Sequence, residues 1–224
     1  MNTLNHIAFI MDGNGRWGLK KKRSRNYGHL SGVKTVQKIV EASIIFKLKI
    51  ITFYVFSTEN WRRPKTEINY LFNLISTYFD KEINNILKNN IRIVISGRFQ
   101  NLPLKTKNIL KKVIKKTKKN TKLTINLAIN YGSKAEIIDS IKKTNYNSQK
   151  LTEENINKNL YSTLPFPDIL IRTGGQKRLS NFMLWQLAYS EIFFLDKLWP
   201  DFTKKDLKKI INKYKKIKRN FGGI

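Results

Sequence analysis

The chain has 224 residues, enough for one globular domain, and 41% of them are hydrophobic, enough to form a buried core. It carries 44 Lys and Arg against 15 Asp and Glu, a formal net charge of +29, which attracts polyanions such as nucleic acids, anionic lipids and diphosphate esters. No cysteine is present, which excludes disulfides, thiolate catalysis and zinc–sulfur sites. Because the lysines are spread through Lys-, Asn- and Ile-rich segments, we favour codon bias of an AT-rich genome over a nucleic-acid role.

The sequence also limits the possible locations of the protein. The apolar run at 7–11 is too short for the hydrophobic region of a signal peptide. No later run approaches the roughly eighteen apolar residues of a membrane span. We expect a cytoplasmic protein, with peripheral contact at the inner face of the membrane as an option, and one domain over 1–224.

Strand-like and helix-like segments alternate along the chain. Strand character is found at 6–11, 50–56, 91–96, 123–128, 168–172 and 192–195. Helical spacing or composition is found at 32–46, 64–89, 103–120 and 203–219, and a polar loop at 144–159 leads into a short helix near Thr152. This alternation predicts an α/β fold with a single central, mostly parallel sheet of about six strands covered by helices.

The helix expected at 64–89 carries one long apolar stripe. Its members are Ile68, Leu71, Phe72, Ile75, Phe79, Ile83, Ile86 and Leu87. Packing of a helix on a sheet explains such a stripe most simply, and a lipid-lined cavity is the alternative.

The first strand ends at Asp12 and opens into Gly13-Asn14-Gly15-Arg16-Trp17. The two glycines permit positive φ and close approach of a ligand to the backbone, and Arg16 adds a fixed positive charge. This pattern is typical of a phosphate site. Because a carboxylate repels phosphate unless a divalent cation lies between them, Asp12 is a candidate metal ligand or catalytic group. A plain turn with a surface Asp is the alternative.

Polar residues follow two further strand ends, and ligands of parallel α/β sheets bind at the carboxyl ends of the strands. The segment 57–64 is dense in polar and aromatic groups, and 173–181 is a second Gly-rich turn, flanked by Arg172 and Arg178. We expect Ser180 to cap a following helix whose N-terminus could bind an anion.

Together these loops resemble the cis-prenyltransferases, and among them the bacterial undecaprenyl diphosphate synthases. The resemblance rests on motifs that occur in order along almost the whole chain: Met-Asp-Gly-Asn-Gly-Arg-Trp (11–17), Arg25 with Gly28-His29, Phe-Ser-Thr-Glu-Asn-Trp-Arg-Arg-Pro (56–64), Asn130-Tyr131-Gly132, Arg-Thr-Gly-Gly (172–175), Arg178-Leu179-Ser180-Asn181-Phe182 and Leu-Trp-Pro-Asp-Phe (198–202).

The resemblance implies a homodimeric enzyme that condenses isopentenyl diphosphate with farnesyl diphosphate, uses Mg²⁺ and forms cis double bonds. The product would be undecaprenyl diphosphate, the lipid carrier precursor for peptidoglycan and other cell-wall polysaccharides, held in an apolar tunnel between sheet and helices. The all-helical fold of the trans-type synthases is not expected, since their paired Asp-rich motifs have no counterpart here.

The same resemblance assigns roles to residues. Asp12 and Asn60 would be catalytic, and Asp12 and Glu191 would bind metal. The primer diphosphate would be bound by Gly13, Asn14, Gly15, Arg16, Trp17, Arg25 and His29; the substrate loop would supply Ser57, Thr58, Glu59, Trp61 and Arg63; isopentenyl diphosphate would be bound by Arg172, Arg178, Leu179 and Ser180. Since an amide is a very weak base, our hypothesis is that Asn60 positions groups while Ser57 or a diphosphate oxygen carries the proton.

Three positions depart from the family pattern. Gln176-Lys177 replaces a frequent acid–His pair, Gly97-Arg98 replaces Gly-Asp, and Asn220 stands where Arg is usual in a segment that reaches the partner's active site. Three alternatives stay open: a synthase of another product length, a basic nucleic-acid-binding protein, and a non-catalytic partner subunit.

Overall fold

The computed structural model describes residues 2–219 and contains one six-stranded sheet in the order β3-β4-β2-β1-β5-β6. The strands are β1 (His6–Ile10), β2 (Ile50–Ser57), β3 (Ile91–Ser96), β4 (Leu123–Tyr131), β5 (Ile169–Arg172) and β6 (Glu191–Phe194). Each neighbouring pair is parallel. The predicted α/β fold with a central parallel sheet is therefore confirmed.

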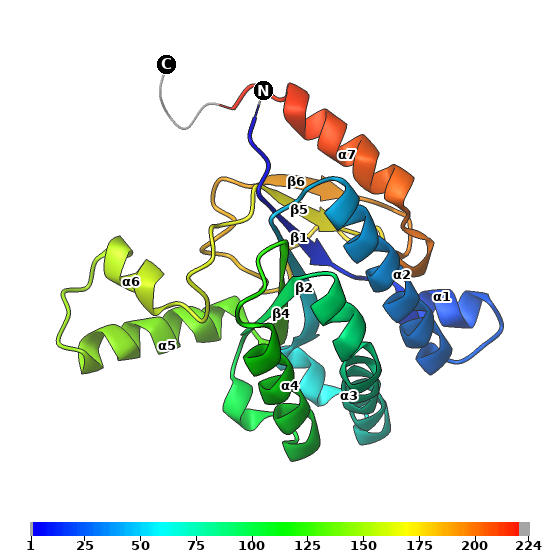
Figure 1. Ribbon diagram of the computed structural model, residues 1–224, viewed down its shortest axis with the longest axis horizontal. Helices are drawn as coiled ribbons and strands as arrows, with labels where there is room; N and C mark the ends of the chain where they lie inside the picture. Colours follow the sequence, from blue (N-terminus) through cyan, green and yellow to red (C-terminus); the bar gives the residue numbers. More distant parts are fainter. Residues whose placement is uncertain (1, 220–224) are drawn as a thin grey trace.

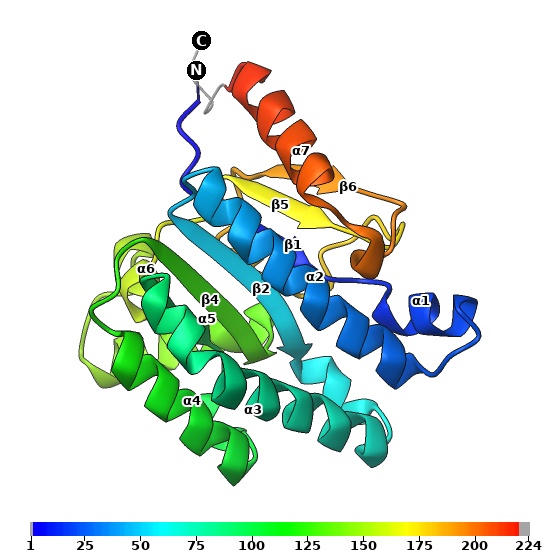
Figure 2. The ribbon, with the colours of Figure 1, turned by 45° about the vertical axis from the view of Figure 1, so that its right-hand side comes forward.

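Helices cover both faces of this sheet, as Figures 1 and 2 show. On one side lie α2 (Arg25–Ile45) and α3 (Lys65–Lys88), with α7 (Lys204–Lys216) beside α2 and α4 (Leu104–Thr117) beside α3. We call these four helices the helical layer. The other side carries α5 (Ser133–Tyr146) and α6 (Glu153–Asn159), while α1 (Asn14–Lys20) follows β1 and packs on the start of α2.

The glycine-rich stretch after β1 is more helical than the sequence suggested. The turn at Gly13 leads into α1, and α2 begins at Arg25 instead of 32, where the Ser24 hydroxyl accepts a hydrogen bond from Tyr27 N. A Cβ at Gly28 would lie 1.9 Å from the carbonyl oxygen of Asn14. The glycines therefore allow two helices to touch, a role that local sequence does not distinguish from helix breaking.

Two other boundaries differ from expectation. The segment expected to be a loop from 144 begins with the last turn of α5, which ends at Tyr146, and α6 then starts after Thr152, whose hydroxyl accepts from Asn155 N. The last helix ends at Lys216, three residues earlier than expected. Polar composition hid α5 because its buried side includes Ser133, Glu136, Ser140 and Thr144.

A series of hydrogen-bonded polar side chains crosses four strands of the sheet. Ser96 Oγ donates to Asn126 Oδ1 at 3.0 Å, and Asn126 Nδ2 donates to Thr52 Oγ1 at 3.2 Å. The ring of His6 lies 2.7 Å from Thr52 Oγ1 and 2.6 Å from the carbonyl oxygen of Pro165. Since a carbonyl only accepts, His6 Nδ1 carries the proton and Nε2 accepts from Thr52. These hydrogen bonds link side chains of four strands, and the neutral imidazole of His6 stands at the end of the series.

Burial lowers the pKa of His6 from 6.5 to about 4, so protonation of this ring opposes folding. Between these two values the unfolded state binds a proton that the folded state does not. The free energy of unfolding should therefore fall by about 3 kcal/mol as the pH drops from above 6.5 to below 4. Urea unfolding across this range checks the slope, and His6→Gln should flatten it. Equal slopes for both proteins would contradict the assignment.

Candidate active site

The three central strands bring the predicted site together. β2, β1 and β5 are neighbours, so their carboxyl ends meet at one edge of the sheet, where Asp12, the 3₁₀ helix Thr58–Arg62 and Arg172 lie. A cavity of about 630 Å³ opens there. Its lining includes these predicted site residues: Asp12, Asn14, His29, Ser57, Glu59, Asn60, Arg63, Arg172, Arg178 and Ser180.

The Asp12 carboxylate lies between two guanidinium groups. Arg16 Nη2 is 3.1 Å from Oδ1 and Arg172 Nη2 is 3.0 Å from Oδ2. The backbone oxygen of Asp12 accepts from Thr173 Oγ1 at 2.8 Å and from Trp199 N at 3.0 Å. With 28% of its side chain exposed, the carboxylate is held in place while staying open to the cavity.

Arg172 connects Asp12 to the second Gly-rich turn. Only 4% of its side chain is exposed; Nη1 donates to Ser180 Oγ at 2.8 Å and to the Arg178 carbonyl oxygen. Arg16 reaches the same turn and donates to the Gly174 oxygen at 2.7 Å. Gly174 has φ +88°, and a Cβ there would lie 2.6 Å from Arg16 Nη2. A side chain at position 174 would collide with Arg16, so the turn needs glycine there for the Arg16 contact to form.

The prediction that Ser180 caps a helix is wrong. Residues 180–189 form turns instead of a helix, and Ser180 and Asn181 adopt left-handed φ values of 50° and 60°. The Ser180 hydroxyl accepts from Arg172. Ser is common both at helix caps and in turns, so the local sequence did not decide between them.

A second charged cluster is centred on Glu67, which sequence reasoning missed. Its carboxylate accepts from Arg63 Nη1 at 3.1 Å and from Arg25 Nε at 3.3 Å, and lies 3.5 Å from His29 Nε2. Although burial by itself raises the pKa of Glu67, the hydrogen bond and charge of Arg25, together with the charge of Arg63, hold this pKa below its usual value. Burial, then the charge of Arg63, lowers the pKa of His29. The one signal of this cluster in the sequence was an acidic side chain four residues after Arg63.

The loop after β2 is closed by a capping box. Asn60 Oδ1 accepts from Ser57 N at 3.1 Å, and the Ser57 side chain accepts from the Asn60 backbone. Two bonds then tie this loop to neighbouring segments: Glu59 Oε1 accepts from Asn181 Nδ2 at 2.8 Å, and Trp61 Nε1 donates to Asn130 Oδ1 at 2.7 Å. The amide group of Asn60 keeps its N–H donors for other partners.

Several predicted site residues belong to the surrounding loops and helices and do not line the cavity themselves. They are Gly13, Gly15, Arg16, Trp17, Arg25, Thr58, Trp61 and Leu179. Trp17 stacks on Tyr27 at 5.8 Å and donates to Asp201 Oδ1 at 2.7 Å, and Leu179 packs against the apolar cluster on the other side of the sheet. Their contacts support the loops that carry the lining residues.

Glu191 is the residue that a single chain does not bring to the site. It pairs in register with Ile169 at the start of β5, whereas Arg172 at the other end of β5 is level with Ile10. Its carboxylate lies 3.7 Å from Arg219 Nε. Within one chain, Glu191 and Asp12 therefore lie at opposite ends of the strands, and the assignment of Glu191 as a second metal-linked carboxylate stays a prediction.

Two apolar cavities continue from the polar one, between α2, α3 and the sheet. The first, of about 120 Å³, shares Met11, His29 and Leu71 with the polar cavity and is also lined by Ile75 and Phe79. The second, of about 230 Å³, shares Phe79 with the first and reaches Ile86 and Ile91. Its outer part is also lined by polar residues: Gln37, Glu41, Glu82, Asn85 and Asn89. Part of the apolar stripe of α3 thus lines cavities, while Ile68 and Phe72 are packed in the core.

The sequence matches over residues 10–222 the family model described as "Putative undecaprenyl diphosphate synthase". The chain belongs to this prenyltransferase family. It is 46% identical to the isoprenyl transferase of Fusobacterium nucleatum, over 100% of this chain and 97% of the relative. It is 44% identical to that of Halalkalibacterium halodurans, over 98% and 89% respectively.

Solved structures agree with this membership. A probable undecaprenyl diphosphate synthase from Campylobacter jejuni superposes with a TM-score of 0.87 at 38% identity, covering 100% of both chains. Lavandulyl diphosphate synthase from Lavandula x intermedia, in complex with dimethylallyl diphosphate, superposes with a TM-score of 0.93 at 27% identity, covering 98% of both. The protein is accordingly a prenyltransferase with the fold of the undecaprenyl diphosphate synthases.

One departure from the family pattern has a structural explanation in this prenyltransferase. Arg98 donates from Nε and Nη2 to the two carboxylate oxygens of Asp139 at 2.9 and 3.0 Å, and Asp139 also accepts from the Tyr161 hydroxyl. The arginine thereby joins the end of β3 to α5. Lys177 is exposed on the second Gly-rich turn, and Asn220 lies outside the described residues.

None of the helices in the described part of the chain combines the length and the apolar character that a membrane span requires.

Proposed function

We propose that this prenyltransferase condenses isopentenyl diphosphate onto farnesyl diphosphate, forming cis double bonds, and makes undecaprenyl diphosphate for cell-wall polysaccharide synthesis. The observation that carries the proposal is the continuity, through shared residues, of an arginine-rich polar cavity with an apolar cavity and then with a second cavity of mixed lining. A molecule with an anionic head and a long hydrocarbon chain matches this arrangement. The dimethylallyl diphosphate bound to lavandulyl diphosphate synthase supports a prenyl diphosphate as ligand.

The charges of the site suit the departure of diphosphate. Cleavage of an allylic C–O bond places additional negative charge on the leaving group, and fixed donors stabilise that charge without reorganising. Arg172 and Arg178 line the cavity, and Arg16 is hydrogen-bonded to Asp12, which also lines it. Arg25 is bonded to Glu67, the partner of the lining residue Arg63. Arg172 Nε is buried without a partner in the residues described, so a donor is left for an anionic ligand.

Asp12 is the carboxylate that we propose for Mg²⁺. Magnesium is usually held by one or two carboxylates together with substrate phosphates and water. Asp12 provides a partly open carboxylate beside the arginines, and residues 2–219 hold no cluster of three His, Asp or Glu that could form a protein-only cage. This donor set fits the ion, which when bound would neutralise the charge of the diphosphate.

We propose that Asn60 positions substrate and does not act as a base. Its amide oxygen already accepts from Ser57 N and is a very weak base, so we expect its N–H donors to be the groups that meet a substrate. A diphosphate oxygen then takes the proton released when the new double bond forms, either directly or through the Ser57 hydroxyl, which accepts one proton as it gives up another.

Turnover of purified protein tests the function directly. Farnesyl diphosphate, radiolabelled isopentenyl diphosphate and Mg²⁺ should yield labelled products that resolve into a ladder ending at the undecaprenyl length. A ladder with a different end would identify a synthase of another product length. No incorporation by folded protein would contradict the proposal.

Phe79 offers a test of the apolar path, because its ring lines both apolar cavities. Phe79→Ala should join the cavities and shift the products to longer chains. Phe72→Ala is the matched control: Phe72 is equally buried on α3 but lines neither cavity. Both variants should lose about 3 kcal/mol of stability, and only the first should change product length. If the two variants made products of the same length, growth of the product through these two cavities would be contradicted.

We also propose that the enzyme is a cytoplasmic homodimer that contacts the inner face of the membrane peripherally. The exposed side chains of Tyr189 and Ile192 near the edge strand β6 support a protein contact there. Sedimentation equilibrium of purified protein would measure the assembly.

A further inference from the structure

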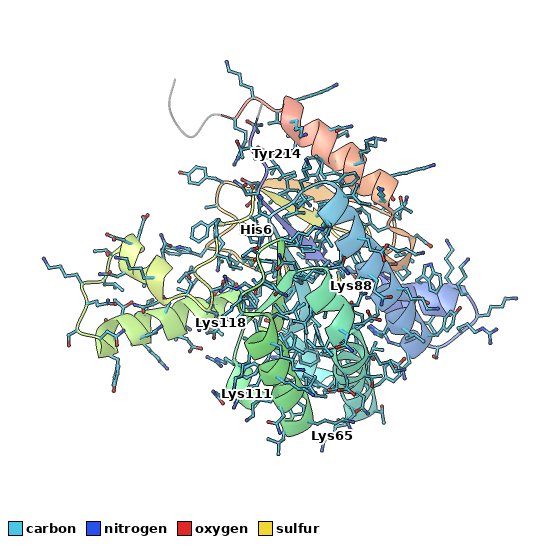
Figure 3. All side chains as sticks on the ribbon, viewed as in Figure 1. His6, Lys65, Lys88, Lys111, Lys118 and Tyr214 are labelled. Carbon is cyan, nitrogen blue, oxygen red and sulfur yellow. The ribbon has the colours of Figure 1, made fainter. Side chains whose placement is uncertain are left out.

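The outer side of α7 carries a patch that the proposed reaction does not use. We call it the α7 lysine face; it consists of Lys205, Lys208, Lys209, Lys213 and Lys216, which with Asn212 line a shallow hollow. The inner side of α7 is buried through Leu207, Ile210, Ile211 and Tyr214. In Figure 3 the side chains on the exposed side of α7 extend away from the body of the molecule.

No carboxylate compensates this charge. Asp206, the one acidic residue of α7, accepts from Lys197 Nζ at 2.8 and 2.9 Å and from Thr203 Oγ1 at 2.7 Å. Over residues 2–219, no ion pair joins a lysine of this face to an acidic side chain. Unpaired like charges on one helix side repel each other, so an anionic partner would stabilise the face.

The face belongs to the helical layer that holds the apolar cavities. α7 packs on α2, where Lys204 Nζ lies 5.6 Å from the centre of the Phe46 ring, and α2 and α3 enclose the cavities. On the other flank, α4 also exposes lysines, among them Lys111, which is labelled in Figure 3. Figure 2 shows α7 beside α2 and α4 beside α3. A product held between α2 and α3 therefore lies between two helices that both expose lysines.

We propose that the α7 lysine face binds the anionic headgroups of a lipid bilayer and so places the helical layer against the membrane that receives the product. The choice of a bilayer rests on the proposed function, whose product is a membrane amphiphile. The composition of the face agrees, since it holds no arginine and no exposed aromatic ring of the kind that stacks on nucleic-acid bases. Clustered lysines are attracted to anionic lipid surfaces.

Co-sedimentation of the full chain with vesicles tests this contact. Binding should require phosphatidylglycerol in phosphatidylcholine vesicles and weaken as salt rises. Replacing Lys208, Lys209, Lys213 and Lys216 together by Gln should lower the partition coefficient at least about tenfold. The matched control replaces Lys134, Lys142, Lys143 and Lys150, exposed on and after α5 on the other side of the sheet, and should change it less than about twofold.

Equal losses in the two variants, or equal binding to vesicles without anionic lipid, would overturn the proposal. Loss of RNA or DNA binding in the α7 variant with unchanged vesicle binding would also overturn it, in favour of a nucleic-acid surface. Because sedimentation needs no substrate, it is independent of turnover. An active enzyme that does not bind vesicles would refute this contact alone, and an inactive protein that binds them would refute the reaction alone.

Discussion

Asp12→Asn should reduce turnover about a thousandfold while leaving the protein folded. The amide keeps the size of the carboxylate but loses the charge that meets Arg16 and Arg172 at 3.1 and 3.0 Å. It also removes the one carboxylate that we propose for Mg²⁺. Initial rates measured over a range of Mg²⁺ concentrations would show whether added metal restores activity, and we expect that it does not.

Asp139→Asn is the matched control for this experiment. Asp139 also holds an arginine, Arg98, at 2.9 and 3.0 Å, but lies on α5, on the other side of the sheet. The Asp139→Asn variant should have a lower free energy of unfolding than the wild-type protein, with little change in its turnover rate. If the two variants were equally active, Asp12 would have only a structural role.

Arg172→Lys should lower kcat/KM for isopentenyl diphosphate about a hundredfold. The guanidinium reaches Asp12 with one nitrogen and Ser180 with another, and a lysine ammonium does not reproduce this planar geometry. Because the side chain is almost fully buried, little solvent is available to replace the lost bonds. Rates measured with isopentenyl diphosphate varied and farnesyl diphosphate saturating would separate kcat from KM.

Arg98→Lys is the corresponding control, since Arg98 also uses two guanidinium nitrogens, here for the two carboxylate oxygens of Asp139, away from the cavity. Its kcat/KM should stay within about threefold of the unchanged enzyme. The role given to Arg172 would be contradicted by a hundredfold loss of kcat/KM in the Arg98→Lys variant. It would also be contradicted if Arg172→Lys kept the kcat/KM of the wild-type enzyme.

The two clusters divide the arginines of the site between different carboxylates. Asp12 holds Arg16 and Arg172, whereas Glu67 holds Arg25 and Arg63. Each arginine is thus fixed before a ligand arrives, and its remaining N–H groups stay available. Such preorganisation lowers the reorganisation needed when charge develops on a bound diphosphate.

The sequence by itself determined the strands, the parallel sheet and the motifs at the strand ends. Buried parallel strands are continuous apolar runs, as in Ile7 to Ile10, and the glycine turns follow directly after them. These signals are local, so a few adjacent residues carry them. The placement of Asp12, Asn60 and Arg172 near one another then followed from the rule that parallel strands share their carboxyl edge.

Only the tertiary structure decided which partners these residues have. Glu67 accepts hydrogen bonds from Arg25 on α2 and from Arg63 at the end of the loop after β2. The Ser180 hydroxyl accepts from Arg172 instead of capping a helix. Glu191 lies at the amino end of β6, at the opposite end of the strands from Asp12, although its motif matches the family. Each of these outcomes depends on contacts between segments far apart in sequence, whose energies compete with local preferences and are set only when the sheet and helices pack.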